Sequence, residues 1–137
     1  MSDADAELMD RAHDLLERVY QQGRHEVVAA FRLADGAVVL GVHVDGSARR
    51  SAVCAEGVAA GAVFAHAAQT GHAAEVVAAV SVLRRPSGTA HVIEPCGVCA
   101  ELLTDYWPEA RVWVTDGERI VETQMQGLLP AKRRRQW

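Results

Sequence analysis

Apolar residues near the start of the chain recur at helical spacing. Leu8, Ala12, Leu15 and Leu16 fall on one face of a helix, acidic residues occupy its first turn, and Gly23 follows where such a helix would end. This pattern predicts an amphipathic helix whose apolar face packs on the protein core.

Four apolar runs form two strand-turn-strand units. In "EVVAAFRLADGAVVLGVHV" (26–44) and in "RVWVTDGERIVET" (111–123), two runs flank an Asp-Gly pair. Asp-Gly suits the positive φ angles that a tight hairpin turn requires. We therefore expect two pairs of antiparallel strands.

The middle of the chain is rich in small residues. Residues 54–70 are mostly Ala, Gly and Val, and Gly71 follows, which predicts a helix that other backbone segments can approach closely. The short apolar run "EVVAAVSVL" (75–83) is typical of a buried strand, and "RRPSGTAHVIE" (84–94) is expected to be a loop.

A third helix is expected over 99–107, where Leu102, Leu103 and Tyr106 recur at helical spacing before Pro108 stops it. The expected order of elements is α, β, β, α, β, α, β, β, with no internal repeat and no linker. An α/β fold follows, in which a five-stranded sheet carries helices on its faces.

Composition places this chain among compact globular proteins. Half of the 137 residues are apolar and 23% are charged, which suits one domain over 1–137. No run approaches the roughly 18 consecutive apolar residues of a membrane span, and the acidic start "MSDADAEL" does not resemble a secretory signal. We therefore expect a cytoplasmic protein with no membrane partner.

The charge distribution argues against a polyanionic ligand. The net charge is −4, and four basic residues lie together at 132–135, so the rest of the chain has a net charge of −8. An acidic body repels nucleic acid, and a small molecule is the expected ligand. The tail "KRRRQW" is expected to be a solvated terminus; alternatively, it brings Trp137 and its arginines to a neighbouring subunit's site.

All three cysteines fall in two short motifs, "VCAEGV" (53–58) and "EPCGVC" (94–99). Three thiols in a reducing cytosol favour metal binding over a disulfide framework. Cys96 and Cys99 have Cys-x-x-Cys spacing at a helix start, and Cys54 offers a third thiolate, which leaves the fourth position of a zinc ion open for catalysis. The other interpretations are buried structural thiols and a closed zinc site completed by His66 or His91.

Glu56 follows Cys54 by two positions and can point into the same pocket without binding the metal. Zinc lowers the pKa of water towards neutrality, and a glutamate can take that proton and then protonate a ring nitrogen and a leaving amine. The alternative is a helix N-terminal charge with no catalytic role.

Cys54-Ala55-Glu56 together with Pro95-Cys96-Gly97-Val98-Cys99 resembles the signature of the cytidine deaminase family, including its blasticidin S deaminase branch. The resemblance covers most of the chain and implies a three-layer α/β/α fold with a five-stranded mixed sheet. It implies that Zn²⁺ is held by the three cysteines and that Glu56 is the general acid and base. It further implies that Ala55 and Glu94 offer backbone groups to the pyrimidine and its amine.

Several positions differ from relatives that act on cytidine. Where those relatives carry Asn-x-Glu to hold ribose hydroxyls, this chain has His43 and Asp45, and His25 lies near the position of an aromatic residue that stacks on the base. Glu94 replaces a small polar residue, and its carboxylate would favour an amine-bearing substrate if it faced the site. Other departures beside the motifs are Gly57, Ala100 and Glu101.

The resemblance implies a zinc-dependent hydrolase that removes the exocyclic amine of a cytosine ring in a free nucleoside. Cytidine or deoxycytidine is the first expectation, and an aminoacyl nucleoside such as blasticidin S is the second. Small members of the family also lead us to expect a homotetramer. The alternatives are a noncatalytic, zinc-stabilised nucleoside-binding or assembly module, and a deaminase acting on a base within nucleic acid.

Overall fold

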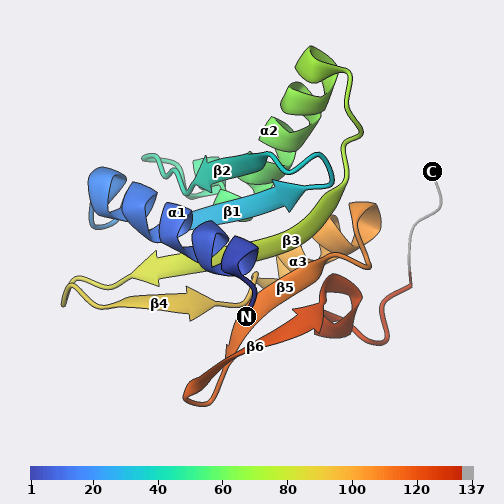
Figure 1. The fold of residues 1–137 in the computed structure, drawn as a ribbon. Helices are drawn as coiled ribbons and strands as arrows, with labels where there is room; N and C mark the ends of the chain where they lie inside the picture. Colours follow the sequence, from blue (N-terminus) through green and yellow to red (C-terminus); the bar gives the residue numbers. More distant parts are fainter. Residues whose placement is uncertain (134–137) are drawn as a thin grey trace.

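The protein forms a mixed β-sheet between two helical layers in a computed structural model that describes residues 1–133 (Figure 1). Arg134, Arg135 and Trp137 of the tail, which was expected to be a solvated terminus or to approach a neighbouring subunit's site, lie outside the described residues. Among residues 1–133, none of the helices combines the length and the apolar character that a membrane crossing requires. The elements are α1 (Asp3–Val19), β1 (Val27–Leu33), β2 (Val38–Val42), α2 (Ala55–Thr70), β3 (Val76–Arg84), β4 (Ala90–Ile93), α3 (Gly97–Tyr106), β5 (Arg111–Asp116) and β6 (Arg119–Gln124), with 3-10 turns at Arg49–Ser51 and Met125–Leu128.

The sheet runs in the order β2-β1-β3-β5-β6, and β4 pairs with β3 beside this path. β1 pairs with β3 along one edge; the other edge of β3 pairs first with β5, in parallel, and then with β4, antiparallel. The predicted three-layer α/β/α arrangement is confirmed, but the sheet has six strands, whereas five were predicted. The missed strand, β4, lies in the segment expected to be a loop, because four residues are too few to show a strand period.

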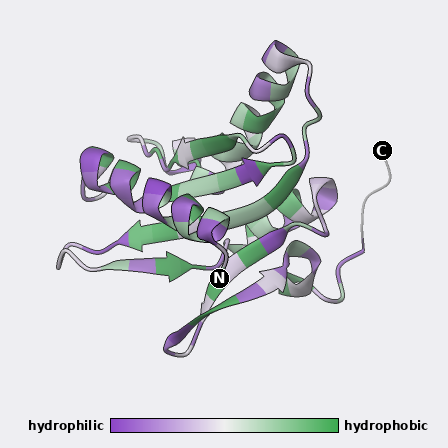
Figure 2. Ribbon diagram, in the orientation of Figure 1, coloured by the Kyte–Doolittle hydropathy of each residue, from purple (hydrophilic) through white to green (hydrophobic). Residues whose placement is uncertain are grey.

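Strand alternation builds two cores, one on each face of the sheet. Val28 and Ala30 of β1 pack with α1, whereas Ala29 and Phe31 pack in the cluster that contains most of the buried residues of α2 and Leu103 of α3. Successive side chains of a strand point to opposite faces, so an almost fully apolar strand serves both cores. Figure 2 shows this concentration of hydrophobic residues in the central strands, while the outward surface of α1 is hydrophilic.

Turn and capping residues set the element boundaries. Ser2 caps α1 by accepting a hydrogen bond from the Asp5 backbone N–H, and Gly71 (φ 75°) ends α2. Gly36 (φ 90°) and Gly117 (φ 63°) lie in the two predicted hairpin turns, which the structure confirms.

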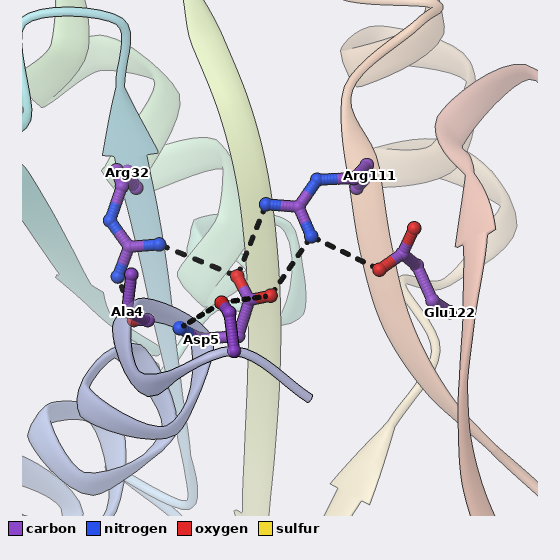
Figure 3. A network of polar contacts seen from close by, with 6 residues as sticks. Ala4, Asp5, Arg32, Arg111 and Glu122 are labelled. Carbon is purple, nitrogen blue, oxygen red and sulfur yellow. Dashed lines mark hydrogen bonds and ion pairs between the residues drawn. The ribbon is translucent and has the colours of Figure 1, made fainter.

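A buried carboxylate joins the first turn of α1 to the sheet (Figure 3). Asp5 is 2% exposed and accepts hydrogen bonds from Arg111 at 2.9 and 3.2 Å and from Arg32 at 3.4 Å. Arg111 also donates to Glu122 of β6 at 3.0 Å. The Arg111 hydrogen bonds outweigh the effect of burial and lower the pKa of Asp5 to about 2. The network therefore links α1, β1, β5 and β6 through one ionised group.

Candidate metal centre and active-site cavity

Two helix starts bring the three thiols together. Cys54 is the N-cap residue of α2, Cys96 is the N-cap residue of α3, and Cys99 lies in the first turn of α3. Their sulfur atoms lie within 4.8 Å of one another, and the Cys54 and Cys96 Sγ atoms are 3.7 Å apart. In a tetrahedral site with Zn–S bonds of about 2.3 Å, the sulfurs lie about 3.8 Å apart, so the thiols fit a zinc ion.

The thiol cluster has three members among residues 1–133, and no histidine or carboxylate joins it. His66 belongs to a different cluster, with Asp35 and His72, and His91 is exposed on β4. Neither histidine closes the site in the described chain. The arrangement therefore has the three-ligand form of a catalytic zinc site.

The surroundings of the three thiols shift their pKa values in different directions. Burial raises the pKa of Cys54, and burial together with the negative charge of Glu56 raises the pKa of Cys99. Burial also opposes ionisation of Cys96, yet hydrogen bonds from the Cys99 N–H, the Cys54 thiol and the Val98 N–H lower its pKa overall. Cys96 is thus the most acidic of the three thiols, and binding of a cation must displace the protons that the thiols still carry.

Gly41 of β2 allows the start of α2 to lie directly on the sheet. A Cβ atom at this position would overlap the Ala55 carbonyl oxygen and the Ala59 backbone nitrogen. Both alanines are fully buried in the same contact. The close approach sets the position of the first turn of α2, and with it the positions of Cys54 and Glu56.

Glu56 is a buried carboxylate held by a hydroxyl from the sheet. It lies in the first turn of α2 and is 4% exposed, and its Oε1 atom accepts a hydrogen bond of 2.7 Å from the Ser81 hydroxyl. Ser81, 2% exposed on β3, was missed by the sequence analysis. The available signal was a lone hydroxyl in the apolar run "VVAAVSVL". A buried carboxylate with a fixed orientation suits a proton carrier better than a solvated helix charge.

A cavity of about 390 Å³ opens in front of these groups, within the range of about 300–1,000 Å³ that is common for small-molecule sites. Most of its exposed wall is apolar. Val27 and Ile93, which the sequence analysis did not single out, contribute to this wall. The lining residues are Val27, His43, Cys54, Ala55, Glu56, Ile93, Glu94 and Cys96.

Of the three side chains predicted to contact the sugar or the base, one lines the cavity and the other two lie next to that residue. His43 lines the cavity, but His25 and Asp45 do not. Instead, the His25 Nδ1 atom lies 2.9 Å from the His43 carbonyl oxygen, and Asp45 Oδ2 lies 3.6 Å from His43 Nε2. The Glu26 N–H donates to His43 Nδ1 at 3.3 Å. His25 therefore contacts the backbone of His43 and Asp45 lies near its imidazole, while Val27 occupies the cavity wall on the first strand.

Comparison with known proteins is consistent with this geometry. Residues 2–115 match the family model of the cytidine and deoxycytidylate deaminase zinc-binding region. Blasticidin-S deaminase of Bacillus cereus is 30% identical, over 96% of this chain and 94% of that protein. The crystal structure of cytidine deaminase from Bacillus anthracis matches with a TM-score of 0.76 at 25% identity, covering 95% of this chain and 89% of that one. That of the Mycobacterium leprae cytidine deaminase matches with a TM-score of 0.72 at 26% identity, covering 95% and 99%.

Proposed function

Because this chain belongs to the cytidine and deoxycytidylate deaminase family, a family of zinc-dependent hydrolases, we propose that it removes the exocyclic amine of a cytosine ring in a free nucleoside. One observation carries the proposal: the buried, oriented carboxylate of Glu56 lies in the same cavity wall as Cys54 and Cys96 of the three-thiol cluster. A proton carrier beside a three-ligand metal site is the minimum that hydrolytic deamination requires.

The proposed mechanism assigns a role to each of these residues. Cys54, Cys96 and Cys99 hold the zinc ion, which, when bound, supplies the Lewis acidity that makes water a nucleophile near neutral pH. Glu56 accepts the proton of the attacking water and passes it to the ring nitrogen. Glu56 then takes the remaining proton from the hydroxyl group on the ring carbon and delivers it to the exocyclic amine, which leaves as ammonia as the carbon–nitrogen bond breaks. The ring keeps the oxygen of water as a carbonyl.

The substrate we propose first is cytidine or deoxycytidine, with His43 on the sugar side of the cavity and the backbone of Ala55 and Glu94 beside the ring. The small, mostly apolar cavity and the acidic chain support a free nucleoside over a polynucleotide. An aminoacyl nucleoside is the second candidate. It is supported by the Bacillus cereus relative named blasticidin-S deaminase and by Glu94, an acidic residue among those that line the cavity. Relative kcat/KM for cytidine, deoxycytidine and blasticidin S separates the two.

The decisive experiment is the loss of cytidine absorbance with the zinc-loaded wild type and with Glu56→Gln. The amide keeps the shape of the side chain but cannot carry the proton, so we expect kcat to fall by at least about 10²–10⁴-fold with zinc content unchanged. Glu118→Gln, at an exposed turn residue, is the matched control and should retain full activity.

The noncatalytic module predicts a different pair of results. In that case neither wild type nor Glu56→Gln turns over any cytosine nucleoside in the panel, while both bind one tightly. That outcome, in protein that retains one zinc ion per chain, would refute the proposed function.

We further propose that the protein is a homotetramer. An apolar stripe of Val98, Leu102 and Tyr106 follows i, i+4 spacing along the exposed surface of α3 and continues onto Phe64 of α2, whose ring centroid lies 5.0 Å from that of Tyr106. All four side chains are at least 36% exposed. A contiguous apolar stripe of this kind is typical of a surface that another protein surface covers, and we assign it to further copies of the chain.

A further inference from the structure

We propose that Asp35, His66 and His72 form a second metal site, which takes a divalent transition-metal ion such as Zn²⁺ at the opposite end of α2 from the thiol cluster. His66 lies twelve residues after Cys54, or about 18 Å along the helix at 1.5 Å per residue, so the two groups cannot share one ion. The site is independent of the proposed deamination.

The three side chains already converge. Their ligand atoms lie within 4.8 Å of one another; Asp35 Oδ2 is 3.1 Å from His66 Nε2 and 2.7 Å from His72 Nδ1. Around an ion with bonds of about 2.0–2.2 Å, neighbouring ligand atoms lie about 3–3.5 Å apart, so only small shifts are needed. Two imidazoles and one carboxylate form a ligand set that suits zinc and other first-row divalent metals.

Local hydrogen bonds hold the ligands in place. Asp35 Oδ1 accepts from the Ala37 N–H at 2.8 Å within the β1–β2 turn, which directs Oδ2 towards the histidines. The Thr70 hydroxyl donates to the His66 carbonyl at 2.9 Å and accepts from the His72 N–H at 3.2 Å. The side chains of Asp35 and His66 are 16% and 29% exposed, and that of His72 is 59% exposed. The metal would therefore find a largely organised site.

The charges also suit a cation. The Ala37 N–H and the two histidines hold the pKa of Asp35 well below its usual range, so the carboxylate is ionised at neutral pH. With two neutral imidazoles and one carboxylate, a divalent ion leaves a net charge of +1 and open positions for water, which favours an exchangeable ion. Such an ion would fasten the β1–β2 hairpin to the C-terminal end of α2.

The test uses untagged, full-length protein loaded with one zinc ion per chain, so that the thiol site is filled, and titrates it with ZnCl₂ by calorimetry at pH 7.5. We expect one further zinc ion per chain. His66→Gln, His72→Gln and Asp35→Asn should each weaken this second binding at least tenfold. Asn keeps the Oδ1 acceptor of the turn and removes the anionic ligand. His91→Gln, at an exposed histidine on β4, is the matched control and should bind like the wild type.

Each result decides for or against the site. The site is supported if the three ligand variants lose the second zinc ion but keep the first one. Their circular dichroism spectra should then match that of the wild type. Absence of a second binding event in the wild type, or its survival in both histidine variants, overturns it, because the three groups then form only a hydrogen-bonded bridge. Deamination is not the readout, so failure of the proposed function would leave this result unaffected.

Discussion

The Ser81–Glu56 hydrogen bond is the contact between the sheet and the proposed proton carrier. Both residues are buried, and the 2.7 Å hydrogen bond joins the middle of the sheet to the first turn of α2. Ser81 does not line the cavity, so it acts on the reaction through Glu56 and is a positioning residue. Such a contact fixes which carboxylate oxygen faces the substrate.

Ser81→Ala should lower kcat for cytosine nucleoside deamination by about ten- to a hundredfold, the equivalent of losing a buried hydrogen bond to a charged group. KM should change little, because Ser81 does not contact the substrate cavity. Steady-state kinetics separate the two parameters. Ser81→Thr, which keeps the hydroxyl, should recover part of the activity, and the exposed Ser87→Ala should be silent. An equal loss in Ser81→Thr and Ser81→Ala would argue against positioning by the hydroxyl.

Helices α2 and α3 each combine a metal-binding start with an exposed outer surface. Two N-cap residues and one first-turn residue of these helices supply the thiols. The inner faces pack in one core, and Phe64 and Tyr106 meet on the outside. A subunit contact on this surface would therefore lie on the same two helices that position the active site.

Leu102→Glu should break the proposed tetramer, because it places a charge in the middle of the apolar stripe on α3. We expect the mass from light scattering or sedimentation to fall from four chains towards one. Ile120→Glu, at a 45% exposed position on β6, is the control and should keep the mass of the wild type. A wild-type protein that is already monomeric would contradict the proposal.

Across the whole molecule, the Asp5 network connects the N-terminus to strands on both sides of β3. Arg32 lies on β1 and Arg111 on β5, so one carboxylate joins segments more than 100 residues apart in the chain. The contribution of ionised Asp5 to stability is fully present at pH values above the pKa that Asp5 has in the unfolded chain. Because its folded pKa is lowered, from 3.8 to about 2, its contribution to stability is lost as the pH falls through this interval.

Asp5→Asn should lower the free energy of unfolding at pH 7 by about 2 kcal/mol, the equivalent of this pKa difference. The gap between wild type and variant should close as the pH falls from about 4 to 2, which urea unfolding at several pH values measures. Asp3→Asn changes an exposed acid in the same helical turn and should cost less than about 1 kcal/mol. A gap that does not depend on pH would show that the charge of Asp5 is not its source.

The sequence alone determined the layered fold, the two hairpin turns and the presence of Glu56 within one of the two cysteine motifs. Each of these depends on short-range patterns: helical spacing, Asp-Gly pairs and the Cys-x-x-Cys motif act within a few neighbouring residues. A strand of four residues has no such pattern, which is why β4 appeared only in the structure.

Only the tertiary structure decided which distant residues meet. Ser81 reaches Glu56, Gly41 admits the start of α2, and Asp35 meets His66 and His72, although none of these groups is adjacent in the chain. The structure also placed His25 and Asp45 around His43 rather than in the cavity wall. These contacts arise from strand register and helix packing, which a single sequence does not encode at short range. The candidate site residues could therefore be predicted from the sequence, while the contacts that support them could not.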